Sequence, residues 1–223
     1  MVKICSLSLW GCAYEYWSGA LQNARLHKSL RSGYDVFIFT DISSLRQALN
    51  DQKIRVIVDE LKQCTTLITI DRTPGYMGMF WRMLPFLWED VERVIVRDAD
   101  SILTSRELEA VRHWERSRYP FHIMRDHPAH TAAVMGGMFG GIVNTQMRKI
   151  FQPLKSLFHA DRHYKLNTGW QVDQVFLQRY VFPLVSHISL IHDPFYDRKS
   201  FPTVREGAEY VGDAVTRKKH NDD

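Results

Sequence analysis

Two aspartates separated by one residue, Asp98 and Asp100, follow the apolar run 94–96 near the middle of the chain. In an extended backbone, side chains two residues apart project to the same side, so the two carboxylates are predicted to converge on one point. Carboxylates placed so closely repel each other unless a cation lies between them, and hard oxygen ligands suit Mg²⁺ or Mn²⁺. The pair therefore predicts a divalent metal site that also holds the two phosphates of a nucleotide diphosphate.

This aspartate pair is also compatible with two different roles. One aspartate could cap the next helix, although Thr104 and Glu107 already match the capping-box pattern that opens a helix. Phosphatases of the haloacid-dehalogenase type also place such a pair after an apolar strand, with the first aspartate as the nucleophile. That strand usually lies near the start of the chain, whereas here several predicted strands and helices precede it. The position favours the metal–diphosphate site.

Four charged residues elsewhere could serve the same chemistry. Arg82 and Arg97 could neutralise phosphate charge as a diphosphate group leaves. Arg125 and Asp126 end a predicted strand, where they could hydrogen-bond the hydroxyls of a donor sugar or form ion pairs that merely close the strand end.

Glycines and histidines in the segment that follows allow further interpretations. Without a Cβ atom, Gly136 and Gly137 would let the backbone approach a sugar closely, or they could simply form a turn. His127 and His130 resemble half of a zinc site, but no thiol or second histidine pair supports zinc.

Several short strings resemble, in content and order, small glycosyltransferases of the GT-A fold found in bacteria and in large algal viruses such as chloroviruses. The strings are residues 79–85 (MFWRMLP), 96–101 (VRDADS), 122–128 (HIMRDHP) and 136–140 (GGMFG). The N-terminal residues 6–11 (SLSLWG), Asn23 with Ala24, and His192 with Asp193 fit the same pattern. The resemblance therefore spans nearly the whole chain.

This resemblance implies an activity and a set of site residues. The activity is transfer of a sugar from a nucleotide-diphosphate sugar, with a UDP-sugar as the expected donor, to a hydroxyl of a carbohydrate or glycoconjugate acceptor, with Mn²⁺ or Mg²⁺ as cofactor. Asp98 and Asp100 would bind the metal, with Asp98 also near the ribose, and His192 would complete the metal shell, because a neutral imidazole is a suitable ligand. The first strand and the loop after it would line the nucleotide pocket with Ser6, Leu7, Trp10 and Tyr14.

Asp173 is the carboxylate that the resemblance assigns to catalysis. In related transferases an acidic residue near this place faces the anomeric carbon or the acceptor hydroxyl. It would act as the general base of an inverting enzyme, or support an ion-pair or covalent intermediate in a retaining one, which family analogy favours. As alternatives, Asp173 could only complement a helix dipole, and the chain could be a metal-dependent phosphatase or nucleotidyltransferase, or a non-catalytic carbohydrate-binding domain.

Alternating strand and helix patterns predict the elements that position these residues. Strands are predicted at residues 2–10, 34–40, 53–58, 66–70, 94–96, 121–124 and 187–191. Helices are predicted at residues 18–30, 42–50, 77–87, 104–115, 146–158 (with a break at Pro153) and 168–181. The alternation predicts an α/β fold with a mainly parallel central sheet flanked by helices, in which ligands bind at the carboxyl ends of the strands. The resemblance implies a GT-A (Rossmann-like) domain over residues 1–216, followed by a frayed tail at 217–223.

Composition excludes several classes of protein. The chain has 223 residues, 45% hydrophobic and 24% charged, which suits one folded α/β domain and argues against disorder. The net charge of +4 is mild, and the one dense basic cluster lies at residues 217–219, so no nucleic-acid partner is predicted. Three cysteines without a CxxC motif favour a reducing compartment, and no apolar run is long enough for a membrane span. These features predict a cytoplasmic protein, and the resemblance implies that the cell is a bacterium or a virus-infected host.

Overall fold

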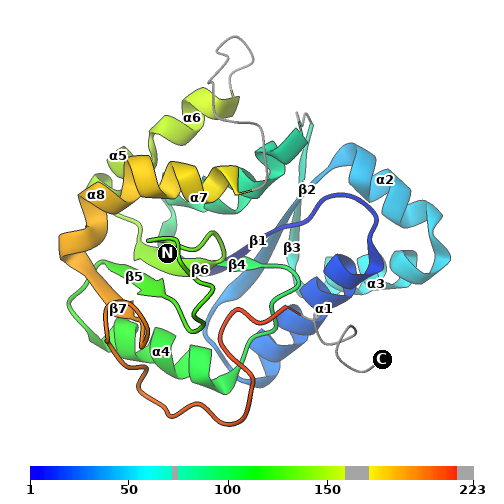
Figure 1. Cartoon of the computed structure of the whole chain (residues 1–223). Helices are drawn as coiled ribbons and strands as arrows, with labels where there is room; N and C mark the ends of the chain where they lie inside the picture. The colour runs from blue at the N-terminus through cyan, green and yellow to red at the C-terminus, as the bar shows by residue number, and fades with distance from the viewer. Residues whose placement is uncertain (72–74, 159–170, 215–223) are drawn as a thin grey trace.

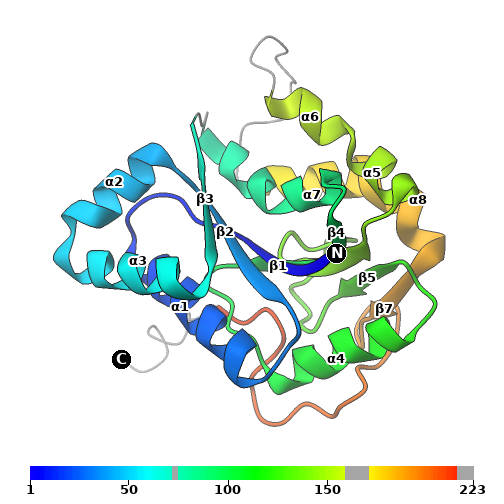
Figure 2. The ribbon, with the colours of Figure 1, turned by 180° about the vertical axis from the view of Figure 1, so that it is seen from behind.

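A seven-stranded sheet forms the centre of the protein (Figure 1). The computed structural model describes residues 1–71, 75–158 and 171–214. The strands are β1 (Val2–Ser8), β2 (Asp35–Asp41), β3 (Thr66–Ile70), β4 (Val91–Asp98), β5 (Phe121–Met124), β6 (Met138–Ile142) and β7 (Ser189–His192). Their order is β3-β2-β1-β4-β6-β5-β7, so β3 and β7 lie at the two edges (Figure 2). Only β6 runs antiparallel to its neighbours, β4 and β5. The predicted mainly parallel α/β sheet is confirmed.

Helices cover both faces of this sheet. The α-helices are α1 (Tyr14–Ser29), α2 (Ile42–Asn50), α3 (Gln52–Cys64), α4 (Ser105–Arg116), α5 (Thr145–Phe151), α6 (Pro153–Phe158), α7 (Val172–Phe176) and α8 (Phe182–Val185). Two 3-10 helices, η1 (Gly75–Leu87) and η3 (Ser186–Ile188), and one π-helix, η2 (Leu177–Val181), complete the described helical elements. One core cluster joins the sheet to α1–α4 through Trp17, Val58 and Trp114. The other joins it to η1, α5 and α7 through Phe80, Phe151 and Phe176.

Strand β4 is the central strand that the sequence predicts. Val94 and Val96 belong to one core cluster, whereas Ile95 between them belongs to the other. Successive side chains of a strand point to opposite faces, so this division shows that β4 is buried on both sides. The strand carries Asp98 at its carboxyl end.

The strand predicted at residues 53–58 is wrong, because these residues lie in α3. Buried residues Ile54, Ile57, Val58 and Leu61 recur at helical spacing. The carboxylate of Asp51 caps the helix by accepting hydrogen bonds from the backbone N–H groups of the second and third residues after it, at 2.8 and 3.1 Å. Local capping and a helical apolar face outweigh the β-branched residues that suggested a strand.

The helix cap predicted at Thr104 is half correct. The hydroxyl of Thr104 accepts a hydrogen bond from the backbone N–H of Glu107 at 3.1 Å, and α4 begins at the next residue, Ser105. The carboxylate of Glu107 turns into the core, where it forms an ion pair with Nε of Arg97 at 2.8 Å. Arg97 also donates to the carbonyl oxygen of Gly137, so it points into the core and does not line a phosphate site.

The remaining predicted elements shift at their boundaries, and two of the predicted helices also change in type, with residues 177–181 of the late helix forming the π-helix η2. The aromatic segment predicted as a helix at residues 77–87 is the 3-10 helix η1, with Pro85 inside it. The late helix predicted from residue 168 is described from Val172, and residues 168–170, like the tail predicted at 217–223, lie outside the described residues. Cys5, Cys12 and Cys64 are free thiols. Within the described ranges, no helix combines the length and apolarity that crossing a membrane requires.

Candidate functional site

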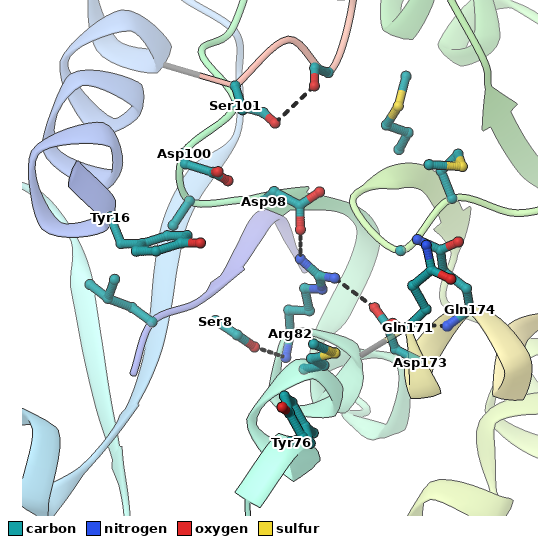
Figure 3. Close-up of a pocket in the computed structure, with 18 of the residues that line it drawn as sticks. Ser8, Tyr16, Tyr76, Arg82, Asp98, Asp100, Ser101, Gln171, Asp173 and Gln174 are labelled. Carbon is teal, nitrogen blue, oxygen red and sulfur yellow. Dashed lines mark hydrogen bonds and ion pairs between the residues drawn. The ribbon is translucent and has the colours of Figure 1, made fainter. Parts of the chain in front are cut away.

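A cavity of about 400 Å³ opens where the carboxyl ends of β1 and β4 meet (Figure 3). Its wall includes Ser8, the last residue of β1, and Asp98, the last residue of β4. Because β6 runs antiparallel, its first residue, Met138, and the preceding Gly136 reach the same edge of the sheet. The volume is typical of a small-molecule site, and the location is where α/β sheets bind ligands.

Asp98 and Asp100 both line this cavity, but Asp98 ends β4 and Asp100 lies in the turn that follows it, so they do not alternate along one strand. Burial acts to raise the pKa of Asp98, but the guanidinium of Arg82, which pairs with its carboxylate, holds that pKa below the ordinary value. Burial, and after it the negative charge of Asp98, raises the pKa of Asp100 to about 6. The pair therefore carries negative charge that Arg82 offsets at Asp98 and leaves poorly compensated at Asp100.

Arg82 connects two carboxylates across the floor of the cavity. Its backbone N–H donates to the hydroxyl of Ser8 at 2.9 Å, which fixes η1 against the end of β1. Its guanidinium donates to the carboxylate of Asp98 from Nη1 and to Oδ2 of Asp173 from Nη2, the latter at 2.7 Å (Figure 3). The side chain is buried, and the two carboxylates raise the pKa of Arg82 above its ordinary value against the effect of burial.

Asp173 is the buried second residue of α7 and lines the cavity. Its Oδ1 atom accepts a hydrogen bond from the backbone N–H of Gln174 at 2.9 Å, while Oδ2 faces Arg82. Gln171, which precedes α7, adopts a left-handed backbone with φ of 75°. Figure 3 shows Tyr16 and Asp100 on one side of Asp98, and Asp173 with the two glutamines on the other. Both glutamines also line the cavity.

Gly136 and Gly137 permit these carboxylates to pack against the backbone. A Cβ atom on Gly136 would lie 2.2 Å from Oδ2 of Asp173, and one on Gly137 would lie 2.1 Å from Oδ2 of Asp98. Gly136 lines the cavity, whereas Gly137 packs behind Asp98. Neither of the two roles considered from the sequence, sugar approach or a turn, anticipates this close contact with the acidic side chains.

Substitution of Gly137 by alanine is expected to destabilise the fold by about 2 kcal/mol, because the added methyl group collides with both the side chain and the backbone of Asp98. The backbone N atom of Asp98 would lie only 2.7 Å from the new Cβ, so rotation of the side chain alone cannot relieve the clash. Urea unfolding measures the loss. A variant with the wild-type urea midpoint would contradict this packing.

The structure does not bring His192 to the aspartates. His192 lies at the end of β7, is buried, and does not line the cavity. Its two ring nitrogens are hydrogen-bonded to His113 at 3.0 Å and to His122 at 2.8 Å. Both nitrogen atoms are therefore engaged within a cluster of histidines, and the expectation that His192 ligates a metal beside Asp98 is not met by this geometry.

This histidine cluster predicts a loss of stability in acid. Burial, and secondarily His113, lowers the pKa of His192 to about 4, and burial lowers the pKa of His122 well below its ordinary value. A base whose pKa is depressed by folding stabilises the protein fully above its unfolded pKa of about 6.5, and this contribution is lost as the pH falls toward 4.

When the pH falls from about 7 to about 5, the free energy of unfolding of wild type is therefore expected to fall by about 2 kcal/mol more than that of His192→Gln. Urea unfolding at a series of pH values measures the two profiles. The matched control is His187→Gln, which changes an exposed histidine and should keep the wild-type profile. Parallel profiles for His192→Gln and wild type would show that His192 does not titrate in this way.

The predicted nucleotide-pocket residues divide into two groups. Trp10 lines the cavity, but Ser6 and Leu7 are buried within β1 and do not reach it. Tyr14, the first residue of α1, is 46% exposed and lies outside the cavity wall, whereas Tyr16 lines it. Tyr16, and not the predicted Tyr14, is therefore the tyrosine that lines the cavity.

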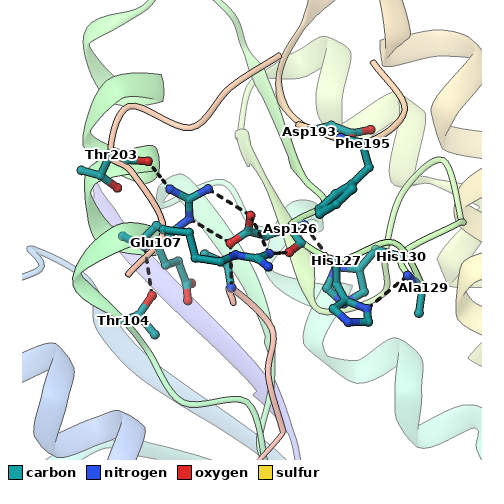
Figure 4. A network of polar contacts seen from close by, with 12 residues as sticks. Thr104, Glu107, Asp126, His127, Ala129, His130, Asp193, Phe195 and Thr203 are labelled. Atoms are coloured by element: carbon teal, nitrogen blue, oxygen red, sulfur yellow. Dashed lines mark hydrogen bonds and ion pairs between the residues drawn. The ribbon is translucent and has the colours of Figure 1, made fainter. Parts of the chain in front are cut away.

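Arg125 and Asp126 form buried ion pairs and do not line the cavity. Nε of Arg125 lies 2.7 Å from Oδ2 of Asp193. The carboxylate of Asp126 pairs with Nε of Arg106 at 2.9 Å and accepts the backbone N–H of Val211 at 3.1 Å (Figure 4). Of the two alternatives for these residues, the ion pair at the strand end is the correct one. The pairs hold the segment after β7 against the end of β5.

That C-terminal segment returns to the cavity and completes its wall. The hydroxyl of Ser101 donates to the carbonyl oxygen of Gly212 at 3.2 Å, and Ser101 forms a β-bridge with Ala214. All three residues line the cavity. Ser101 belongs to the string around the aspartates, but no local pattern signals that Gly212 and Ala214, more than a hundred residues later, lie opposite it.

The two aspartates suit a metal ion whose other ligands are water and the phosphate oxygens of a substrate. Among the residues that the structure describes, no group of three His, Cys, Asp or Glu side chains is placed to hold a metal ion. Mg²⁺ and similar hard cations are commonly bound by one or two carboxylates together with water and substrate phosphates. The carboxylates of Asp98 and Asp100 fit this second mode, because burial and then the charge of Asp98 disfavour ionisation of Asp100, and a nearby cation would offset both.

Comparison with known proteins gives distant likenesses in structure. No family model and no curated protein sequence matches the chain. A glycosyltransferase involved in the glycosylation of the major capsid of PBCV-1 is 13% identical, with a TM-score of 0.47 over 86% of this chain and 81% of that one. A 4-diphosphocytidyl-2C-methyl-D-erythritol synthase from Anaerococcus prevotii is 10% identical, with a TM-score of 0.47 over 91% and 93% of the two chains. The mannosyltransferase PcManGT from Pyrobaculum calidifontis, in complex with GDP-Man and Mn²⁺, is 12% identical, with a TM-score of 0.43 over 69% and 46%.

Proposed function

We propose that the protein transfers a glycosyl group from a nucleotide-diphosphate sugar, specifically a UDP-sugar, to a hydroxyl of a carbohydrate acceptor. The observation that carries this proposal is the convergence of Asp98, Asp100 and Asp173 on one cavity at the carboxyl ends of β1 and β4. A pair of carboxylates for a metal and a third, separately positioned carboxylate match the two tasks of the reaction: neutralising the leaving diphosphate and assisting the reacting sugar. We assign this activity to a domain of residues 1–216.

Asp98 and Asp100 would hold Mn²⁺ or Mg²⁺. When bound, the ion supplies positive charge to the diphosphate as the glycosidic bond breaks. Arg82 keeps the carboxylate of Asp98 ionised and fixed, because their pairing lowers the pKa of Asp98. Tyr16 and Trp10 lie in the part of the wall that follows β1, where we place the nucleoside.

Asp173 would act on the sugar side of the cavity. Its ion pair with Arg82 fixes the orientation of the carboxylate, and Gln171 and Gln174 beside it offer amide groups to sugar hydroxyls (Figure 3). In an inverting reaction the free lone pair of Asp173 accepts the proton of the acceptor hydroxyl. In a retaining reaction the same carboxylate stabilises positive charge at the anomeric carbon. The anomeric configuration of the product, read by NMR, distinguishes the two.

Incubation of the protein with a panel of nucleotide sugars tests the proposed function. We expect Mn²⁺-dependent release of a nucleoside diphosphate together with free or transferred sugar, and loss of this release when EDTA removes the metal. Release of inorganic phosphate or pyrophosphate would instead identify a phosphatase or a nucleotidyltransferase. Affinity for sugars without metal-dependent turnover would identify a carbohydrate-binding domain.

A further inference from the structure

Two neighbouring aromatic side chains are exposed on the turn that follows β7. Phe195 is 39% and Tyr196 is 50% exposed. Large apolar rings placed together on a surface often mark a binding site, because water solvates them poorly. Neither ring lines the cavity, so the cavity itself does not account for their exposure.

Hydrogen bonds to the buried side chain of Asp193 fix the backbone of the turn that carries these rings. Oδ1 of Asp193 accepts hydrogen bonds from the backbone N–H groups of Phe195 and Tyr196, at 2.8 and 2.9 Å. Asp193 is buried and paired with Arg125, and its backbone forms two hydrogen bonds with Lys199. Because the backbone is fixed before any ligand arrives, a ligand that stacks on the rings does not have to order this turn.

The rings adjoin the wall of the cavity. The hydroxyl of Tyr196 donates to the carbonyl oxygen of Pro128, and the next two residues, Ala129 and His130, line the cavity. The ring of Phe195 points toward the loop that carries His127 and His130 (Figure 4). The two exposed rings therefore lie beside the part of the loop between β5 and β6 that lines the cavity.

Polar groups border the same rings. His127 is partly exposed and stacks on the buried ring of Tyr210, with ring centroids 4.3 Å apart. The guanidinium groups of Arg205 and Arg125 lie over the rings of Phe195 and Tyr196, 5.8 and 5.9 Å from the ring centroids, and the carboxylate of Asp197 pairs with Arg125. Aromatic rings with one face toward a cation and with polar groups nearby suit a pyranose ring, whose C–H groups lie on its faces and whose hydroxyls lie at its edge.

We propose that Phe195, Tyr196 and His127 form an acceptor subsite that binds a sugar ring of a carbohydrate acceptor beside the cavity that holds the donor. This inference rests on the proposed glycosyl transfer and names where its acceptor binds. We assign the nucleotide to the cavity wall near Tyr16 and Trp10, and neither Phe195 nor Tyr196 lines that cavity, so the aromatic subsite and the nucleotide pocket are separate surfaces.

Saturation-transfer NMR on the whole chain tests the subsite directly. The probes are methyl glycosides of glucose, galactose, mannose and xylose and the disaccharides cellobiose and maltose, each titrated with UDP and Mn²⁺ present. We expect at least one probe to bind wild type and to lose about tenfold in affinity in Phe195→Ala and in Tyr196→Ala, because each variant removes a stacking face. Tyr196→Phe keeps the ring and should stay within about twofold of wild type.

Tyr119→Ala is the matched control, because Tyr119 is a tyrosine of similar exposure, at 45%, that lies after α4. It should bind the saccharides as wild type does. All variants should retain the wild-type affinity for UDP with Mn²⁺. A titration of UDP with Mn²⁺ and without any saccharide therefore reports separately on the nucleotide pocket.

The outcomes separate the subsite from the proposed function. Saccharide affinity that is unchanged in Phe195→Ala and Tyr196→Ala, or absent in wild type for every probe, overturns the subsite. So does an equal loss of UDP affinity, which would place the rings on the nucleotide. Failure of the proposed function has a different signature: wild type then shows no Mn²⁺-dependent UDP binding and releases no nucleoside diphosphate, whatever the saccharides do.

Discussion

Asp100→Asn is expected to lower turnover of the nucleotide sugar by about a thousandfold and to remove the contribution of Mn²⁺ to UDP binding. The substitution keeps the shape of the side chain but removes the charge that the cation needs. Asp98 would remain, yet its carboxylate already pairs with Arg82, so it cannot by itself replace the lost ligand. Isothermal titration calorimetry with UDP, with and without Mn²⁺, measures the binding effect apart from turnover.

In the absence of metal, the same substitution is expected to make the protein more stable, although it impairs turnover. The pKa of Asp100 is raised to about 6 by burial and by Asp98, so its proton is held more tightly in the folded than in the unfolded chain. Stability from this group is therefore present at low pH and is lost as the pH rises through about 6. At about pH 8 we expect Asp100→Asn to be more stable than wild type by on the order of 1 kcal/mol, and the difference to vanish toward pH 4.

Asp90→Asn is the control for this pair of effects. Asp90 is exposed and precedes the first residue of β4, so the same chemical change is made at the opposite end of the same strand. It should leave turnover, UDP binding and stability near wild type. If Asp100→Asn also retained Mn²⁺-assisted UDP binding, the two aspartates would not form the metal site.

Local sequence patterns predict the acidic pair because the relevant signals lie within a few residues. The apolar run before Asp98 indicates a buried strand that carries the pair at its end. The alternation of an extended backbone does not reach Asp100, because β4 ends at Asp98 and residues 99–100 form a turn. The position of β4 in the middle of the sheet brings both aspartates to an edge where α/β folds bind ligands.

Residues whose role depends on distant partners are predicted less well. Arg82 lines the cavity, but one of the two carboxylates that its guanidinium contacts belongs to Asp173, 91 residues away. His192 is the last residue of β7, one residue inside the strand that is expected to precede it, and β7 pairs with β5 at the edge of the sheet, so its ring meets His122 and not the aspartates. Which partners Arg82 and His192 meet depends on how distant elements are arranged around the sheet, and no local sequence pattern predicts that arrangement.

The predicted start of the first helix, which is four residues too late, explains why Tyr14 and not Tyr16 is expected in the nucleotide pocket. Successive residues of a helix turn by about 100°, so residues two apart point to nearly opposite sides. With α1 beginning at Tyr14, that residue faces solvent and Tyr16 faces Asp100 and the cavity. The sequence predicts this helix from residue 18 and leaves both tyrosines in a loop, where no phase distinguishes them.

Asp173→Asn is expected to lower turnover by about a thousandfold while the affinity for UDP with Mn²⁺ stays within about twofold of wild type. The carboxylate lines the cavity apart from Asp100 and Tyr16, so under the proposed function it would contribute to the reacting group and not to nucleotide binding. This separation of turnover from nucleotide affinity distinguishes Asp173 from Asp100, whose substitution is expected to impair both.

Arg82 determines whether this variant can be interpreted. The amide oxygen of an asparagine can still accept the hydrogen bond from Nη2 of Arg82, so Asp173→Asn should fold with a loss of about 1–2 kcal/mol. Arg82→Met, by contrast, leaves the carboxylates of Asp98 and Asp173 facing each other without a cation, and a loss of about 3 kcal/mol or more is expected. Circular dichroism and urea unfolding measure both losses before any rate is compared.

The control for Asp173→Asn is Asp59→Asn, which neutralises an exposed aspartate of α3 and should not alter turnover. Single-turnover kinetics with saturating donor then isolates the chemical step from binding. Wild-type rates in a folded Asp173→Asn protein would show that its carboxylate only anchors Arg82, and the reacting sugar would need another partner among the cavity residues. A slow chemical step with intact nucleotide binding would place Asp173 at the anomeric carbon or at the acceptor hydroxyl, because no other described carboxylate lines that side of the cavity.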